Sequence, residues 1–411
     1  MEQNFRLKDA MVQSGYTQAE LVEALNQSLI AAGHRGTVSD RTVRYWLTGK
    51  SAWPQQRQRD ALEAVFGCPA FELGFVPPEG SLLRRTFLAS TTMAGASLSQ
   101  STTRSTGRIG TGDVAGLRAS LESLTGLDDK RGGHAELERA ALAGAADCLG
   151  MQDRASSQRI RQRLLGLASD FTATAAWSNV DVRQLDRAHG QLKEALYLAR
   201  MANDSATEMR VWNSLAMLAH QRKEHGQAID AGYAAQATSV TRRDRLFASL
   251  AHARTAVGHA NRGDRQPALK SLGFAEDLLS KADPHAVRPS WIAFYGPAEL
   301  YALGAIVRDR LGYAAEAEAA SYRALAALPD QFRRNRALAT TRLALAQLHQ
   351  GDAEQACSTA AEVFDLMADA PLPGRMRSLI GDFYRDLLTL APDAAVAREW
   401  GDRYRDHWSR R

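Results

Sequence analysis

Six basic residues stand within 25 positions near the N-terminus, where Asp40 is the single opposing acid. They are Arg35, Arg41, Arg44, Lys50, Arg57 and Arg59. Guanidinium and ammonium groups bind phosphate oxygens, and arginine also pairs with the edge of guanine through two hydrogen bonds. This segment therefore predicts recognition of a nucleic acid rather than catalysis.

A short helix must carry two of these arginines. Ser39 is a suitable N-cap for a helix over residues 40–48, in which Trp46 would lie on the buried face. Arg41 and Arg44 are spaced i, i+3, so they would share the opposite face. A solvated helix face is the alternative interpretation of this arginine pair.

Another helix is predicted just before it. Thr17 is a suitable N-cap, and Leu21, Leu25 and Leu29 form the buried stripe of a helix. Residues 27–36 then separate this helix from the one that carries the arginines.

These segments resemble the Cro/repressor-type (XRE-like) helix-turn-helix of transcriptional regulators. The matching pieces are Thr17-Gln18-Ala19-Glu20-Leu21, Val38-Ser39, Thr42-Val43-Arg44-Tyr45-Trp46, Gly49-Lys50 and Pro54. The resemblance implies that the helix over 40–48 enters the major groove of double-stranded DNA. It departs from the family pattern at residues 27–36, about ten extra residues, which predict either a longer first helix or an enlarged loop.

Individual roles follow from side-chain chemistry. The helix N-terminus at Thr17 and Gln18 offers free N–H groups to a phosphate. Lys50 and Arg57 are expected to clamp phosphates. Asp40 either reads cytosine or stabilises its own helix N-terminus, and the second role is favoured. The complete predicted DNA-binding set is Thr17, Gln18, Ser39, Asp40, Arg41, Thr42, Arg44, Tyr45, Lys50 and Arg57.

The chain divides into three parts by composition. Residues 1–76 form the DNA-binding domain, and residues 77–112 are a linker in which 10 of the 19 residues over 89–107 are Ser or Thr. Residues 113–411 are rich in Ala and Leu, with helical periodicity and no alternating strand pattern. We therefore expect an all-α protein: a helix-turn-helix domain followed by a solenoid of helical hairpins.

The repeat signal lies in four glycines. Gly226, Gly263, Gly312 and Gly351 each have an alanine seven residues before and five residues after, at intervals of 37, 49 and 39 residues. Small residues on both sides of a glycine turn let two antiparallel helices approach closely. Gly190 would mark a degenerate earlier unit, in which Arg183 occupies a position expected to be small. The pattern resembles the tetratricopeptide repeat family, and a generic Ala-rich bundle is the alternative.

A hairpin solenoid forms a concave groove that holds peptides or partner segments. Regulators of similar architecture, including actinobacterial ones and the peptide-sensing regulators of Gram-positive bacteria, imply a peptide or small-molecule effector, a homodimer and a palindromic operator. The groove candidates are Arg210, Asn213, Arg254, Tyr295 and Asn335, and an exposed polar residue is the alternative for each. The stretch over 291–297 either lines a pocket or packs between repeats. His220 and His225 are expected to be exposed or core-lining.

Other functions are disfavoured. Common hydrolase, metalloprotease, nucleotide-binding and CxxC motifs are missing, so we expect no catalytic residue, metal or cofactor, and no enzyme. Scattered cysteines and the lack of a long apolar run predict a cytoplasmic protein without a membrane partner. The Arg84-Arg85 pair resembles an export signal but lies too far from the N-terminus. The leading hypothesis is a ligand-responsive transcriptional regulator, and the alternative is a tetratricopeptide-type adaptor without sequence-specific DNA binding.

Overall fold

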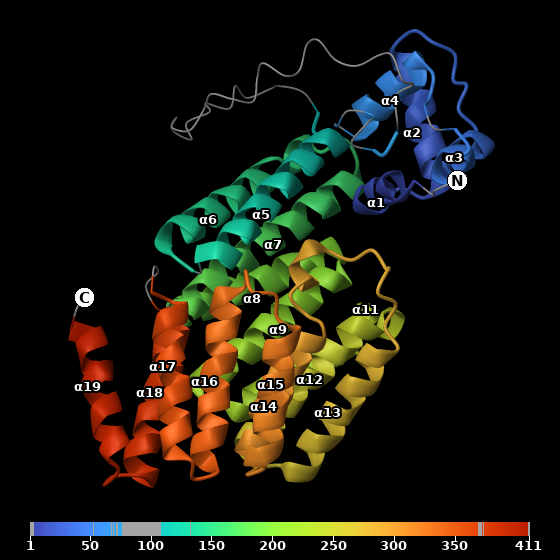
Figure 1. The fold of residues 1–411 in the computed structure, drawn as a ribbon. Coiled ribbons are helices and arrows are strands. Elements are labelled where there is room, and N and C mark those ends of the chain that lie inside the picture. The colour runs from blue at the N-terminus through green and yellow to red at the C-terminus, as the bar shows by residue number, and fades with distance from the viewer. Residues whose placement is uncertain are drawn as a thin grey trace. The chain divides into compact units, whose positions relative to one another are not determined.

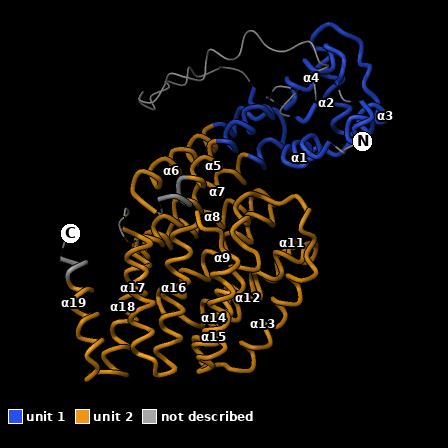
Figure 2. Tube along the Cα trace, viewed as in Figure 1, with its two compact units in different colours: residues 1–119, 151–163 blue, residues 120–150, 164–411 orange. Residues whose placement is uncertain are grey.

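The computed structural model describes residues 4–51, 53–66, 68, 70, 73–75, 108–131, 133–368, 372 and 374–409. Over these residues the chain is all-helical, apart from one isolated β-bridge between Ile109 and Ala155 (Figure 1). It divides into two compact units, 1–119 with 151–163 and 120–150 with 164–411 (Figure 2). No helix of the described part is long and apolar enough to cross a membrane.

Among the described residues up to position 75, unit 1 contains four helices. They are α1 (Phe5–Gln13), α2 (Gln18–Ala31), α3 (Asp40–Leu47) and α4 (Gln56–Phe66). The predicted caps are confirmed: Thr17 and Ser39 each accept a hydrogen bond from the third residue of the helix that follows. The predicted stripe of Leu21, Leu25 and Leu29 is buried.

One apolar core holds these four helices together. Trp46 is 1% exposed and packs edge-to-face on Phe75, with ring centroids 5.9 Å apart. Val43 of α3 and Leu62 of α4 are fully buried in the same core. The inward face of α3 is therefore fixed by packing, which leaves its other face to solvent.

The remaining helices follow in chain order. They are α5 (Thr111–Arg131), α6 (Ala135–Gly150), η1 (Gln152–Arg154), α7 (Gln158–Asp181), α8 (Leu185–Ala202), α9 (Ser205–Arg222), α10 (His225–Ala237), α11 (Ser239–Arg243), α12 (Arg245–Arg262), α13 (Arg265–Ser280), η2 (Ser290–Ile292), α14 (Pro297–Arg310), α15 (Ala314–Ala327), α16 (Arg333–His349), α17 (Ala353–Leu366), α18 (Gly374–Leu390) and α19 (Ala395–Ser409).

From α9 to α17 unit 2 is built from antiparallel helix pairs. The first helices of four pairs, α9, α12, α14 and α16, pack in that order, and each also packs on the second helix of its own pair. Because each pair reverses the chain direction, the four first helices run parallel to one another. Their C-terminal ends therefore lie at one end of the row and their N-terminal ends at the other.

Two of the predicted turn positions are wrong. Gly226 lies inside α10, and the left-handed residue of that turn is Lys223, with φ 61°. Gly190 lies inside α8, and the earlier turn is at Arg183, with φ 65°. Glycine is preferred at left-handed positions because it has no Cβ. Since a lysine and an arginine occupy these two positions, the sequence pattern did not reveal where the two turns lie.

With this correction a regular pattern appears. The left-handed residues that follow this spacing are Arg183, Lys223, Gly263, Gly312 and Gly351, at intervals of 40, 40, 49 and 39 residues. Asn203, with φ 55°, is a further left-handed residue and lies between α8 and α9. Each of the five that follow the spacing has an alanine seven residues before it and another five after it, and every one of these alanines is at most 4% exposed. The methyl groups fill the contact between the two helices of a pair, where a larger side chain would push them apart.

Two expectations fall outside the described residues. Residues 77–107 of the predicted linker and the Arg84-Arg85 pair both lie there. The domain boundaries at 76 and 113 therefore stay predictions.

Candidate functional site

The outward face of α3 is basic. Asp40, Arg41 and Arg44 are exposed on this short helix, and Lys50 is exposed just beyond its end. Gly49 ends the helix in a left-handed conformation with φ 70°, as predicted. The helix stops at Leu47, one residue earlier than expected, with Thr48 as its C-cap.

Tyr45 organises the cations on this face. The guanidinium of Arg41 lies 5.3 Å from the centre of the Tyr45 ring, and the ammonium of Lys50 lies 5.6 Å from it. Arg41 Nε also donates a hydrogen bond of 2.8 Å to the Tyr45 hydroxyl. Tyr45 therefore attracts both cations through its ring.

Two side-chain amides of α2 fix the position of α3. Gln18 Nε2 donates to the backbone carbonyl of Asp40 at 2.7 Å. Asn26 Nδ2 donates to the carbonyl of Val38 at 2.8 Å, and its Oδ1 accepts from the Val38 N–H at 3.0 Å. Both alternatives raised by the extra residues hold, because α2 extends to Ala31 and residues 32–39 form an enlarged loop.

The N-terminus of α2 is already occupied by an acid. The Glu20 carboxylate accepts hydrogen bonds from the Thr17 N–H at 2.8 Å and the Thr17 hydroxyl at 2.9 Å. These bonds hold the pKa of Glu20 below its usual value. Glu20 also pairs with Arg159 of unit 1, with Nη1 and Oε1 2.6 Å apart. An ionised carboxylate here disfavours phosphate, so the expected role of Thr17 and Gln18 in binding phosphate receives no support from this geometry.

The other predicted contacts differ in availability. Ser39 and Thr42 are joined by a hydrogen bond of 3.0 Å between their hydroxyls, in a reciprocal cap of α3. Arg57 is exposed on α4. Arg59 donates to the carbonyl of Pro54 at 2.6 Å and stacks 4.6 Å from the Trp53 ring, so it braces the preceding loop.

Unit 2 contains a cavity of about 1240 Å³ along its row of first helices. Four of the five predicted groove residues line it: Arg210, Asn213, Arg254 and Asn335. The fifth, Tyr295, is 4% exposed, belongs to the neighbouring apolar core and shares a hydrogen bond of 2.7 Å with Ser249. The stretch over 291–297 does both things considered for it, since Phe294 lines the cavity and Trp291 both lines it and packs in the core.

Five cations of the lining are paired with carboxylates. Arg210 binds Asp170 at 2.8 Å, and Arg254, 5% exposed, lies 3.5 Å from Glu299. Arg334 lies 2.7 Å and Arg375 3.6 Å from the buried Asp181. Arg385 pairs with Asp382. Asn213 accepts from Arg254 Nε at 2.8 Å, so one of its amide groups is already engaged.

Four further cations line the cavity without an ion pair among the described residues. They are Arg183, Lys223, Arg310 and Arg342. Among the described lining residues, Asp386 is the one carboxylate outside the pairs above, and it lies 3.4 Å from His349. The described lining is therefore strongly positive, a property that the sequence analysis missed because the charges come from helices far apart in the chain.

The two histidines expected to be exposed or core-lining both line this cavity. Burial and the charges of Arg342, Arg310 and Arg254 lower the pKa of His220 to about 3, so its ring is neutral at physiological pH. Its Nδ1 lies 3.0 Å from Asn261 Nδ2. His225 Nδ1 is buried and has no partner among the described residues.

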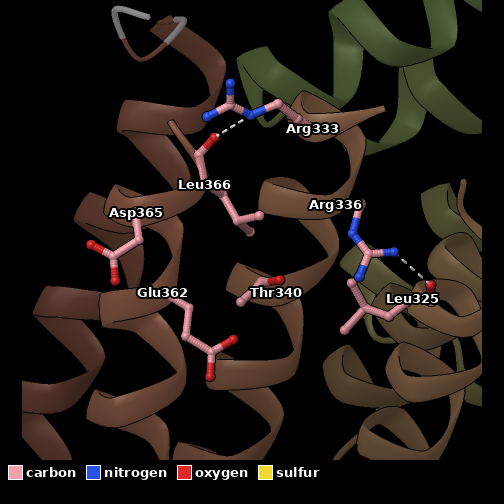
Figure 3. A pocket seen from close by; sticks show the side chains of 7 residues that line it. All are labelled: Leu325, Arg333, Arg336, Thr340, Glu362, Asp365 and Leu366. Carbon is pink, nitrogen blue, oxygen red and sulfur yellow. Dashed lines mark hydrogen bonds between the residues drawn. The ribbon is translucent and has the colours of Figure 1, made fainter. Parts of the chain in front are cut away.

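A second, smaller hollow of about 460 Å³ lies between α15, α16 and α17 (Figure 3). Two arginines in this hollow donate hydrogen bonds to backbone carbonyls. Arg333 Nε donates to the carbonyl of Leu366 at 3.0 Å, and Arg336 Nη1 donates to the carbonyl of Leu325 at 3.1 Å. These bonds satisfy carbonyls near the ends of α17 and α15, so we assign this hollow a structural role.

Comparison with family models and with curated protein sequences finds no match to this chain.

Proposed function

We propose that the chain is a sequence-specific DNA-binding transcriptional regulator whose C-terminal helical repeats bind an effector. In this proposal α2 and α3 form the helix-turn-helix, and α3 lies in the major groove. The observation that carries the proposal is the outward face of α3, where Arg41, Arg44 and Lys50 are exposed together around Tyr45.

Two further features support this assignment. Gln18 and Asn26 hold α3 and its preceding loop by side-chain hydrogen bonds to the backbone, and such preorganisation favours specific readout. Arg41 and Arg44 suit guanine edges, whereas Lys50 and Arg57 suit phosphates. Asp40 stands in the first turn of α3, where it stabilises the helix N-terminus.

For unit 2 we propose tetratricopeptide-like repeats, on the basis of the paired helices and the buried alanines beside each turn. The cavity along the first helices is the proposed effector site. We further propose a cytoplasmic homodimer that binds a palindromic operator, since a two-fold dimer presents two recognition helices to two half-sites.

The salt dependence of duplex binding tests the DNA-binding proposal. Affinity for duplex DNA should fall steeply with salt because phosphate contacts release counterions, and Lys50→Ala should reduce the slope by about one ion. Arg139→Ala/Arg242→Ala, a matched removal of two exposed charges in unit 2, should leave binding unchanged. A folded protein that binds no duplex at low salt would instead favour an adaptor that uses unit 2 alone.

A further inference from the structure

The two ends of the unit 2 cavity differ in chemistry. Because the first helices run parallel, lining residues near their C-termini gather at one end, which we call the turn end. His220 of α9, Asn261 of α12 and Arg310 of α14 stand there, whereas Arg342 lies near the middle of α16, seven residues before its last residue.

The opposite end, which we call the loop end, carries aromatic side chains beside the charged residues Arg210, Glu299 and Arg334. Trp291 and Phe294 precede α14, and Phe332 precedes α16. Phe294 and Phe332 remain 42% and 41% exposed, although aromatic side chains of this size usually bury their rings. Over the 14 residues of α14 a helix rises about 20 Å, which sets the scale of the separation between the two ends.

Two arginines at or near the turn end make no ion pair with any described residue. Arg310 and Arg342 have no ion-pair partner among the described residues, and Arg342 Nη1 is buried without a hydrogen bond. Burial, and after it the charge of Arg310, lower the pKa of Arg342 to about 10, while the nearby Asp309 acts in the opposite direction. Arg310 is exposed at the end of α14, whereas Arg342 is partly buried. A guanidinium group taken out of water without a partner is costly unless an anion joins it.

Uncharged hydrogen-bonding groups accompany the two arginines. Gln221 lines the same cavity, and both its amide oxygen and its amide nitrogen are buried without a partner among the described residues. The unpartnered Nδ1 of His225 belongs to the following helix. Buried polar atoms are normally satisfied in folded proteins, so these buried groups without partners among the described residues indicate a polar ligand.

We propose that the turn end binds the carboxylate or phosphate of a small amphiphilic anion, with Arg310 and Arg342 as the principal ligands. The aromatic side chains of the loop end would cover the apolar body of the same molecule. This inference rests on the proposed function, because the anion is the effector that the proposed regulator would bind. The nearby ion pairs of Arg210, Arg334 and Arg375 frame the cavity and are not assigned to the anion.

The test uses full-length protein without DNA and measures binding of simple probes by ligand-observed NMR and calorimetry. 4-Octylphenyl phosphate and 4-octylphenylacetate carry the two candidate head groups on a body long enough to extend from the turn end toward the loop end. Inorganic phosphate carries the head without the body, and 4-octylbenzylamine (the benzylamine probe) carries the opposite charge. We expect the two aromatic anions to bind more tightly than inorganic phosphate and the benzylamine probe not to bind. The tighter of the two aromatic anions identifies the head group.

Arg310→Gln/Arg342→Gln should weaken binding of the aromatic anions at least tenfold, and Arg342→Lys should weaken it less because the charge remains. Arg139→Gln/Arg242→Gln serves as the matched control and should bind like the wild type. The double glutamine variant should unfold at the same temperature or higher, because a partly buried charge without an ion-pair partner has been removed.

Absence of binding by both aromatic anions, or equal binding by the wild type and the double glutamine variant, would overturn the inference. Because no DNA is present, failure of the DNA-binding proposal would leave this result unaffected. Conversely, a chain that binds DNA but neither anion would retain the proposed function and lose only this assignment.

Discussion

The side-chain amide of Asn26 binds both backbone groups of Val38, accepting from its N–H at 3.0 Å and donating to its carbonyl at 2.8 Å. These two hydrogen bonds fix the end of the enlarged loop over residues 32–39, directly before Ser39, the N-cap of α3. A long connection that would otherwise leave α3 loosely placed is thereby anchored to α2. We infer that Asn26 is a positioning residue for the proposed recognition helix.

Asn26→Ala should therefore weaken DNA binding without removing a DNA contact. Val38 is 5% exposed, so loss of the amide leaves two nearly buried backbone groups unsatisfied, at a cost of about 1–3 kcal/mol. We expect the Val38 amide to exchange with solvent at least about fivefold faster in hydrogen–deuterium exchange. Gln27→Ala, at the exposed neighbouring position, should leave both measurements unchanged. Unchanged exchange at Val38 in Asn26→Ala would contradict the anchoring role.

Substitutions at two of the left-handed turn residues should change the free energy of unfolding in opposite directions. Gly351 has φ 89° and open space around its Cα, so Gly351→Ala should destabilise the protein through backbone strain alone, by about 1 kcal/mol. Lys223→Gly should stabilise it by a similar amount, because the lysine already bears that strain. Denaturant unfolding measures both. Gly190→Ala, inside α8 in open space, is the control and should be mildly stabilising. A neutral Gly351→Ala would refute the assigned register.

His349 should make part of the stability depend on pH. Its hydrogen bond of 2.6 Å to Asp309 and its contact of 3.4 Å with Asp386 raise its pKa above the usual value. A raised pKa in the folded state means that this stabilisation is complete below about pH 6.5. It is lost as the pH rises through the raised pKa. The difference in unfolding free energy between wild type and His349→Gln should therefore shrink from pH 6 to pH 9.

Comparison with His349→Gln at each pH is needed because His220 acts in the opposite direction. The lowered pKa of His220 means that its contribution is present above about pH 6.5 and declines as the solution becomes more acidic. A difference between wild type and His349→Gln that grows with pH would show that the Asp309–His349 pair does not stabilise the fold.

Local signals in the sequence were sufficient for unit 1. The caps at Thr17 and Ser39, the buried leucines of α2 and the stop at Gly49 all depend on residues within a few positions of one another. What could not be predicted was the partner of each polar side chain. Gln18 was expected to bind phosphate, yet its amide nitrogen donates to Asp40 across the 22 positions between them.

In the cavity, too, lining residues of a single helix could be predicted, whereas the pairing of charges between helices could not. Arg210 and Asn213 were expected to line a groove and do so, because both lie on one helix whose pattern was visible. Arg310 and Arg342 were not predicted because they come from different helix pairs. In this Arg-rich chain the sequence does not indicate which arginines form an ion pair with a carboxylate. Asp181, for example, takes up Arg334 from 153 residues away.

Selection of bound sequences from a random duplex pool by the full-length protein tests the central claim most directly. The account predicts an enriched palindrome, which Arg41→Ala/Arg44→Ala loses while Arg139→Ala/Arg242→Ala retains it. Each lost arginine–guanine contact should cost about 1–3 kcal/mol of discrimination. A folded protein that enriches no sequence, with or without an anion that binds its cavity, or an enrichment unchanged in Arg41→Ala/Arg44→Ala, would contradict the assignment of α3 as the recognition helix.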